Sequence, residues 1–419
     1  MSIISNRKGW IQEQIGTHCI VGDGAHAKIK RQNSGVKYLT SKNFKNGRLD
    51  LSKLDYISEE SYQKYFKEDS KALTKPQPND VLFSIIGTIG EPYLVQNGDK
   101  YGLSSSVSII RTSKLKIYPN YLYYWIRGQI FQDALYGIKG GVAQSYVSLE
   151  MIKSLPLYYP SLSTQHKIAS ILSAYDDLIE NNTRRIKILE SMAQTIYQEW
   201  FVKFRFPGHK QVKMVESDLG LIPEGWEVKN LKDVCNLVMG QSPKSEFYNE
   251  TGEGLPFHQG VSNFGARFPT DKIYCTVLNR IAEAGDILFS VRAPVGRINI
   301  ANKKIIIGRG LCGIRSNTDN QSFIFQQLKE KFSEEDLMGG GTIFKSVTKK
   351  DMQEIKLIIP STDILQKFES IVNPVFRNLE LLISKNDNLR KTRDLLLPKL
   401  ISGQIDVENL DIDTGEIAA

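Results

Sequence analysis

The sequence predicts an α+β chain made of two copies of a globular module, each followed by a long helix. Three observations predict this architecture: an internal duplication, short β-like runs punctuated by glycine, and two stretches with an unbroken heptad spacing of apolar residues. The 419 residues are enough for two or three domains, and 41% of them are hydrophobic, so each module can bury a core.

The duplication is visible as short phrases that recur in the same order. Asp80-Val-Leu-Phe-Ser84 returns as Asp286-Ile-Leu-Phe-Ser290, and Asn43-Phe44 returns as Asn263-Phe264. Further along the chain the register settles at a constant offset of 200, which pairs Pro160 with Pro360. Because stacked solenoids need three or more repeats, we expect a pseudo-symmetric pair of large modules.

Each module mixes strands with a helix. The apolar runs Val81–Ile86, Val107–Ile110 and Ile355–Ile359 predict strands. The stretch Tyr118–Leu135 predicts one amphipathic helix, and Gln321–Phe332 predicts its counterpart in the second copy.

The two helical stretches carry apolar residues at alternating spacings of four and three. This spacing predicts coiled-coil helices rather than two amphipathic helices on separate cores. We expect the interface to include Ile168, Leu172, Ile179, Asn182, Ile186, Leu189 and Trp200 of the first helix and Phe368, Val372, Leu379, Leu382, Asn386, Leu389 and Leu400 of the second.

An antiparallel pairing about a two-fold axis near residue 184 places position i opposite position 568 minus i. Asn182 then faces Asn386, so that one buried amide satisfies the other and fixes the register. Ile168 faces Leu400, Leu189 faces Leu379, and Trp200 faces Phe368.

Two residues fit this seam poorly. Arg393 falls opposite Tyr175, where we expect it to stack on the ring or to reach solvent. Pro398 is expected to end or kink the second helix.

Charge and composition restrict the partners. The net charge of +8 and the pI near 9.0 favour a polyanionic partner. The four cysteines show no CxxC pairing, which indicates reduced thiols, and no segment resembles a signal peptide or a membrane span, so we expect a cytoplasmic protein. The acidic residues 406–419 are expected to form a solvated tail.

The sequence offers no catalytic constellation and no metal site. A GxxxxGK[ST] phosphate loop is missing, and the five histidines form no HExxH pair. Asp80 and Asp286 are expected to cap or turn the entry to a strand rather than to catalyse a reaction.

Two longer phrases resemble a known family. Pro160-Ser-Leu-Ser-Thr-Gln-His-Lys-Ile-Ala-Ser-Ile-Leu172 resembles the central helical region of type I restriction–modification specificity subunits. Arg393-Asp-Leu-Leu-Leu-Pro-Lys-Leu-Ile-Ser-Gly-Gln-Ile405 resembles the end of their distal helix. Together with the duplication, this resemblance covers residues 1–405.

The resemblance implies a division of the chain. It implies a first target recognition domain at residues 1–160, a central helical region at 161–208, a second target recognition domain at 209–359 and a distal helical region at 360–405, with an acidic tail at 406–419. The fold it implies is two pseudo-symmetric target recognition domains of α/β type, separated by two long antiparallel coiled-coil helices.

The resemblance also implies a function without catalysis. Each recognition domain reads one half of a bipartite site in double-stranded DNA. The helices set the spacer and dock two DNA methyltransferase subunits, and restriction subunits complete the complex. S-adenosylmethionine, ATP and magnesium belong to those partners, so this chain binds no cofactor. The alternatives are a standalone DNA-binding regulator and a coiled-coil adaptor with no role on DNA.

Base reading requires polar or cationic side chains on loops. The candidates for DNA contact are polar or basic residues near glycines or strand ends: Lys28, Lys30, Arg31, Gln32, Lys42, Asn43, Lys45, Arg48 and Gln144 in the first module, and Gln241, Ser242, Lys244, His258, Gln259, Asn263, Arg267, Arg292, Arg297 and Lys345 in the second.

Overall fold

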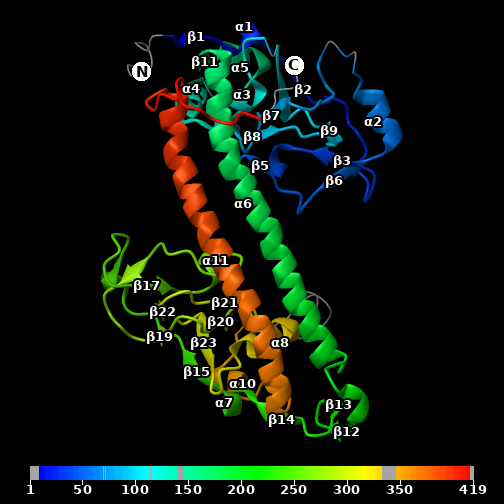
Figure 1. Cartoon of the computed structure of the whole chain (residues 1–419), viewed down its shortest axis with the longest axis vertical. Helices are drawn as coiled ribbons and strands as arrows, with labels where there is room; N and C mark the ends of the chain where they lie inside the picture. The colour runs from blue at the N-terminus through cyan, green and yellow to red at the C-terminus, as the bar shows by residue number, and fades with distance from the viewer. Residues whose placement is uncertain are drawn as a thin grey trace. The chain divides into compact units, whose positions relative to one another are not determined.

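The computed structural model describes residues 9–68, 70, 72–113, 115–138, 146–332 and 346–415 (Figure 1). The chain divides into two compact units, which we call unit 1 (Met1–Asn182 with Ser384–Ala419) and unit 2 (Thr183–Ile383). Each unit combines one globular module with part of each long helix, because α6 (Leu162–Tyr197) and α11 (Thr362–Ile401) cross the boundary.

The module of unit 1 is built on a four-stranded antiparallel sheet in the order β2-β10-β7-β8 and a three-stranded sheet in the order β6-β3-β9. A hairpin, β4–β5, and a two-stranded sheet, β1–β11, complete it. The strands are β1 (Ile11–Gln14), β2 (Cys19–Asp23), β3 (Val36–Leu39), β4 (Phe44–Lys45), β5 (Arg48–Leu49), β6 (Asp55–Ile57), β7 (Val81–Ser84), β8 (Pro92–Leu94), β9 (Tyr101–Leu103), β10 (Val107–Thr112) and β11 (Pro156–Tyr159).

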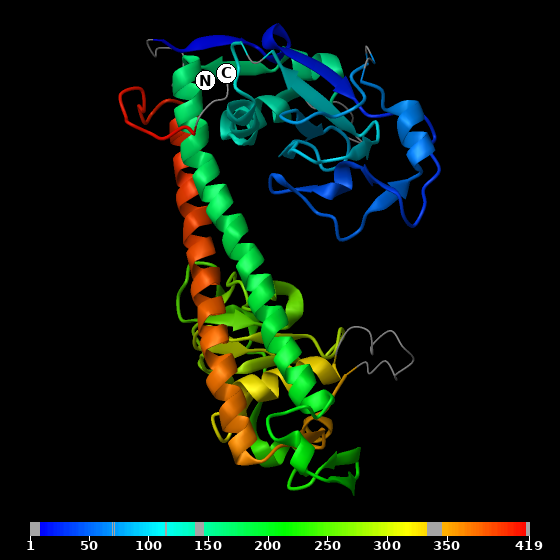
Figure 2. The same cartoon turned by 45° about the vertical axis from the view of Figure 1, so that its right-hand side comes forward.

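The helices of this module are short, and α2 lies at the edge of the module away from α6 (Figure 2). Their bounds are α1 (Ile15–His18), η1 (Ser41–Asn43), α2 (Glu59–Tyr65), α3 (Pro119–Arg127), α4 (Gln129–Ile138) and α5 (Leu149–Ser154). The core of the module gathers buried residues of α3, of the central strand β7 and of the first turns of α6, including Trp125, Phe83 and Leu172.

The predicted helix Tyr118–Leu135 is wrong, because two helices occupy this stretch. Gly128 ends α3 in an extended conformation, with φ −74° and ψ 148°. A Cβ at Gly128 would lie 1.9 Å from Cδ1 of Ile401 at the end of α11. The break therefore lets the module accept the end of the second long helix.

The module of unit 2 repeats the pattern with a four-stranded sheet in the order β15-β23-β20-β21 and a five-stranded sheet in the order β16-β18-β17-β22-β19. Its elements are η3 (His209–Gln211), β12 (Met214–Ser217), β13 (Gly220–Pro223), β14 (Glu227–Asn230), α7 (Leu231–Val234), β15 (Cys235–Met239), η4 (Ser245–Phe247), β16 (Tyr248–Asn249), β17 (Leu255–His258), η5 (Val261–Asn263), β18 (Tyr274–Cys275), β19 (Ile281–Ala282), β20 (Ile287–Ser290), β21 (Ile298–Ile300), β22 (Ile305–Ile307), β23 (Leu311–Ser316), α8 (Gln321–Lys331), α10 (Lys349–Gln353) and β24 (Lys356–Ile359).

The duplication is confirmed at the level of strand pairing and of an ion pair that each module makes to a buried aspartate. Arg111 donates from Nε and Nη2 to Asp80 at 2.8 and 2.7 Å, and Arg315 does the same to Asp286 at 2.6 and 2.9 Å. Each aspartate also accepts a backbone N–H three residues earlier in the chain, so the predicted turn at the strand entry is confirmed. The predicted strands coincide with β7, β10 and β24, and the predicted helix Gln321–Phe332 coincides with α8.

In unit 1 the first part of α6 and the last part of α11 run side by side (Figures 1 and 2). Asn182 donates to Oδ1 of Asn386 at 3.0 Å, and Asn386 donates to the carbonyl of Ile179 at 3.3 Å. The predicted asparagine pair is therefore confirmed. Ile168 and Leu400 share the core of this unit, as their predicted opposition requires.

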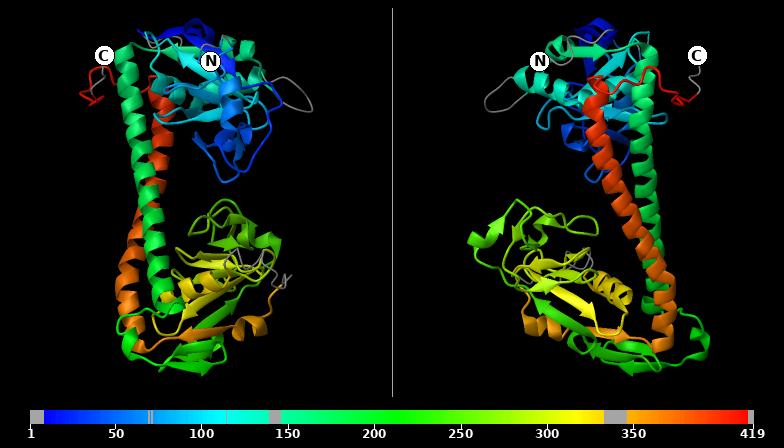
Figure 3. Two further views of the ribbon diagram at one scale, coloured as in Figure 1. Left: turned by 90° about the vertical axis from the view of Figure 1, so that its right-hand side faces the viewer. Right: turned by 60° about the vertical axis from the view of Figure 1, so that its left-hand side comes forward.

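In unit 2 the later part of α6, followed by a π-helical turn, η2 (Gln198–Val202), pairs with the first part of α11, with α8 beside them (Figure 3). The rings of Trp200 and Phe368 have their centroids 6.1 Å apart, which confirms that opposition. Leu189 and Leu379 belong to one cluster. All fourteen expected interface positions are buried or half-buried. The two-fold axis relates the two units to each other and stays a prediction.

Two expectations for the second helix need correction. Arg393 neither stacks on Tyr175 nor reaches solvent, because its guanidinium forms an ion pair with Asp176, one residue further along α6. Pro398 does not end the second helix, because α11 continues to Ile401, and the kink that was the alternative stays a prediction.

The acidic tail is not wholly solvated. Val407 is 1% exposed within the core of unit 1, and Ile405 and Ile412 pack against that core. Lys167 of α6 donates to the carbonyl of Glu408 at 2.7 Å. Apolar residues that alternate with the acids anchor this segment, so its acidic composition alone did not predict its burial.

Candidate nucleic-acid interface

Three loops of unit 2 meet at the ends of β15, β17 and β22, and we call residues 240–244, 259–260 and 308–310 the unit 2 loop cluster. Ser242 donates to Oε1 of Gln259 at 2.7 Å, and the backbone N–H of Arg309 donates to the hydroxyl of Ser242 at 3.2 Å. Gln241, Gln259 and Arg309 are exposed there. The cluster therefore presents two amides and a guanidinium on one hydrogen-bonded framework.

Glycines make this close approach possible. A Cβ on Gly240 would lie 2.1 Å from the carbonyl of Gly308, and a Cβ on Gly308 would lie 2.8 Å from Cα of Gln259. The N–H of Gly310 donates to the carbonyl of Gln259 at 3.1 Å. Side chains at these glycines would separate the loops and remove the surface that displays Gln259.

The equivalent cluster of unit 1 carries different side chains, and we call residues 24–28, 40–41 and 104–106 the unit 1 loop cluster. The same backbone bonds build it, since Ala25 donates to Leu103 at 2.9 Å where Gln241 donates to Ile307 at 3.0 Å. Three serines take the place of Gly308-Arg309-Gly310, and Ser106 accepts from the N–H of Ser41 at 3.1 Å. Two modules of one fold thus present different hydrogen-bonding groups.

The basic segment of unit 1 lies on the surface of its module. Lys28, Lys30, Arg31 and Gln32 are exposed. The guanidinium of Arg31 lies 3.6 Å from the ring centroid of Tyr38 and its Nε lies 3.3 Å from Asp55. Burial raises the pKa of Tyr38, so its hydroxyl stays protonated and its ring offers a neutral surface to the cation.

Three candidates are buried, and the prediction of DNA contact is wrong for each of them. His258 is fully buried, and its Nε2 lies 3.0 Å from Asp271. Asn43 is 4% exposed, and its amide donates to the carbonyls of Asp50 and Lys53 at 3.1 Å each. Arg267 is 5% exposed and lies 4.2 Å from the ring centroid of Phe376 and 5.1 Å from that of Phe325. Burial lowers the pKa of the Arg267 guanidinium, and its Nε has no hydrogen-bond partner within the described residues.

The remaining candidates are dispersed. Arg292 is exposed and follows Val291, which donates to the carbonyl of Gly310, so it borders the unit 2 loop cluster. Arg297 lines a separate cavity of about 340 Å³ with Arg267. Lys244 is exposed and lies 3.7 Å from Glu246, and Asn263 is half-buried at the end of η5. Gln144 and Lys345 lie outside the described residues.

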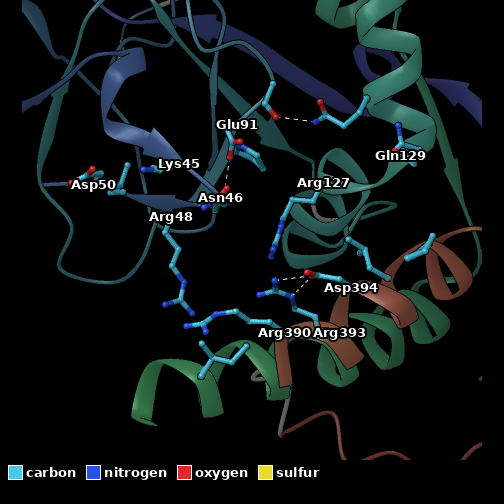
Figure 4. A pocket seen from close by; sticks show the side chains of 18 of the residues that line it. Lys45, Asn46, Arg48, Asp50, Glu91, Arg127, Gln129, Arg390, Arg393 and Asp394 are labelled. Atoms are coloured by element: carbon cyan, nitrogen blue, oxygen red, sulfur yellow. Dashed lines mark hydrogen bonds and ion pairs between the residues drawn. The ribbon is translucent and has the colours of Figure 1, made fainter. Parts of the chain in front are cut away.

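A cavity of about 1010 Å³ in unit 1, which the sequence did not predict, lies between the β4–β5 hairpin and the long helices (Figure 4). Lys45 and Arg48 of this cavity were candidates, whereas Arg127, Arg390 and Arg393 were not. We call it the basic cavity. The heptad pattern places Arg390 on the helix surface but gives no sign that a hairpin distant in sequence closes over it.

Asp176 connects the module of unit 1 to the helices at the back of this cavity. It accepts from Arg127 and from Tyr124 at 3.1 and 2.9 Å and is paired with Arg393. Burial opposes its ionisation, but the two guanidinium groups hold the pKa of Asp176 below its ordinary value. Phe376 stands at the equivalent position, offset by 200, where it contacts Arg267.

The described residues contain no cluster of histidines, cysteines or acids suited to a metal ion. Among the helices that the structure describes, none combines the length and the apolar character of a bilayer-spanning segment. The four cysteines are free and buried.

Comparison with known proteins accounts for the duplication. The type I restriction modification DNA specificity domain matches residues 22–191 and again residues 223–391. This chain belongs to the type I restriction–modification specificity subunits. It is therefore a specificity subunit with two recognition domains, and such subunits are not enzymes themselves.

Several relatives match this specificity subunit over most of their length. The putative type I restriction enzyme MjaX specificity subunit of Methanocaldococcus jannaschii is 32% identical over 93% of this chain and 92% of the relative. The HindI specificity subunit of Haemophilus influenzae is 25% identical over 80% and 88%. A crystal structure of the type I restriction–modification S subunit from M. genitalium has the same fold, with a TM-score of 0.63 and 17% identity over 95% of this chain and 97% of that one.

Proposed function

We propose that this specificity subunit reads a bipartite, asymmetric DNA site, one half with each recognition domain, and that its helices set the unread spacer and dock two methyltransferase subunits. The observation that carries the proposal is the pair of loop clusters, which share one backbone framework but present different side chains. Different hydrogen-bonding groups at equivalent places select different bases.

The exposed side chains suit major-groove readout. Amide groups such as Gln241 and Gln259 pair with adenine, and a guanidinium such as Arg309 pairs with guanine. Lys28, Lys30 and Arg31 supply cations for backbone phosphates. In unit 2, Arg292 lies beside the loop cluster and supplies a cation for a backbone phosphate.

The helices support the proposed ruler and docking roles. The asparagine pair fixes the register of α6 against α11 in unit 1, and two helices held in one register form a spacer of constant length. The exposed apolar residues Leu178 and Ile188 of α6 and Leu381 and Leu395 of α11 are available to methyltransferase helices.

We assign the chemistry to partner subunits. The methyltransferase uses S-adenosylmethionine, and the restriction subunits use ATP and magnesium. In this proposal the present chain contributes recognition, spacing and docking in the cytoplasm, where the DNA is, and holds no cofactor.

Methylome sequencing of a host that expresses this chain with its methyltransferase tests the proposal. We expect a two-part methylated motif with a fixed spacer. A standalone regulator would bind its site tightly without the methyltransferase and leave no methylation. A coiled-coil adaptor would show no salt-dependent DNA binding, so either result would refute the proposal.

A further inference from the structure

The basic cavity of unit 1 holds more cations than its carboxylates neutralise. Five basic side chains line it, against three acidic ones. Its lining includes Lys45, Arg48, Arg127, Arg390 and Arg393 together with Asp50, Glu91 and Asp394.

The acidic side chains are engaged locally. Glu91 accepts from the backbone N–H of Gly47 at 3.0 Å, and Asp50 accepts from that of Ser52 at 3.0 Å. Asp394 accepts twice from Arg393, at 2.9 and 2.8 Å. The inner cations Arg127 and Arg393 also share Asp176, so the back of the cavity is electrically satisfied.

The outer cations differ. Within the described residues no carboxylate lies within 4.0 Å of the Lys45 ammonium or of the Arg48 guanidinium, which donates instead to the carbonyl of Asp176 at 3.4 Å. Arg390 has an exposed ion pair with Asp387 at 3.1 Å. Figure 4 shows the side chains of Arg48 and Arg390 extending toward the same part of the cavity.

The hairpin explains why these cations converge. Asn46 and Gly47 have φ values of 54° and 72°, as a two-residue hairpin turn requires, and Lys45 pairs with Arg48 across it. The turn therefore holds two cations side by side, and Arg48 extends from it toward Arg390 of α11 (Figure 4). Like charges in one place repel each other, and an anion between them removes that cost.

We infer that Lys45, Arg48 and Arg390 form a phosphate-binding site of unit 1 that holds the backbone of the bound DNA outside the bases that are read, an inference that rests on the proposed function. The three side chains are exposed or half-buried, so they suit a phosphodiester presented by a duplex better than an enclosed small ion.

In the second module the positions equivalent to Lys45, Arg48 and Arg390 are not basic. The equivalent hairpin of unit 2 has Gly265 and Phe268 at the places of Lys45 and Arg48, and Glu190 stands at the place of Arg390. The corresponding cavity of unit 2 measures about 340 Å³ and contains the buried Arg267. The backbone contact is thus a property of the first recognition domain.

The test measures DNA affinity of the complex with the methyltransferase as a function of salt, with one duplex that carries the methylated motif and one scrambled duplex. The variant is Arg48→Gln with Arg390→Gln. The matched control is Lys37→Gln with Lys391→Gln, which removes two exposed cations of unit 1 that do not line the cavity.

We expect the cavity variant to bind both duplexes about tenfold more weakly and to lower the salt slope by about two, with the methylated motif unchanged. The control pair should keep the native slope. Arg48→Lys, which retains the charge, should also keep it. Thermal unfolding of each variant shows whether the fold is retained.

Equal slopes for the cavity variant and the control would overturn the assignment while the methylated motif still supported the proposed function. Loss of the motif in the native complex would instead refute the function. Inorganic tripolyphosphate provides a second arm. If it bound the native chain through Arg48 and Arg390 while the DNA slope stayed unchanged, the site would serve small polyphosphates and not DNA.

Discussion

At the scale of single residues, Asp176 is the charge on which the joint between module and helix in unit 1 depends. It is bound to Arg127 and Arg393, whose side chains are 11% and 12% exposed. In unit 2 the equivalent joint between module and helix is formed by Phe376, whose ring contacts the guanidinium of Arg267. One module therefore uses an ion-pair network where its copy uses cation–π contacts.

Replacing Asp176 removes the carboxylate that Arg127 is paired with and leaves Arg393 with the exposed Asp394 alone. We expect Asp176→Asn to lower the free energy of unfolding by about 3 kcal/mol, measured by urea denaturation. Asp177→Asn is the matched control, because Asp177 is exposed on the same turn and should change stability by less than about 0.5 kcal/mol. Equal losses for the two variants would contradict the role given to Asp176.

His258 makes the stability of unit 2 depend on pH. It is fully buried next to the exposed Gln259, its Nε2 lies 3.0 Å from Asp271, and Lys303 pairs with the same carboxylate at 2.7 Å. Burial lowers the pKa of His258 below 6.5, although Asp271 opposes the shift. Because the folded pKa is the lower one, stability is complete above about pH 6.5 and is lost as the pH falls toward the folded pKa.

Thermal unfolding at several pH values tests this. The native chain should lose stability below pH 6.5 more steeply than His258→Gln, whereas His26→Gln, at an exposed histidine, should follow the native curve. If the pH dependence of His258→Gln equalled that of the native chain, the buried imidazole would not be its source.

At the scale of elements, periodicity was sufficient to predict the two long helices. The heptad spacing predicted that Asn182 faces Asn386, because the register of two paired helices follows from the spacing of their interface residues alone. The burial of Arg267 could not be predicted from the sequence, because an arginine in a loop is normally exposed. The rings that cover it, Phe325 and Phe376, belong to elements distant in the sequence. Arg309 was missed because Gly308-Arg309-Gly310 is equally typical of an ordinary turn.

The asparagine pair should show a strong coupling. Asn182→Leu leaves the Asn386 amide buried without this partner, so we expect a loss of about 1–3 kcal/mol in the free energy of unfolding. The double variant with Asn386→Leu should recover most of that loss, because both polar groups are gone. Additive losses in this double-mutant cycle would show that the two side chains do not act as a pair.

At the scale of the whole molecule, the helices carry the proposed ruler. Removing residues 183–189 from α6 and 379–385 from α11 deletes one heptad from each helix. The two deleted segments face each other in the predicted pairing, so every remaining residue keeps its partner on the other helix. Seven helical residues span about 10.5 Å, the length of about three base pairs. We expect a shorter spacer and unchanged half-sites in the methylome of the variant. Altered half-site sequences would contradict the ruler.

The most direct measurement of the division of labour exchanges one recognition domain. Residues 223–359 would be replaced by the second recognition domain of a relative with another methylated motif, and the methylome would be sequenced with the native methyltransferase. We predict that one half of the motif changes to the half of the relative while the other half stays the same. A change in both halves, or in neither, would contradict two independent readers.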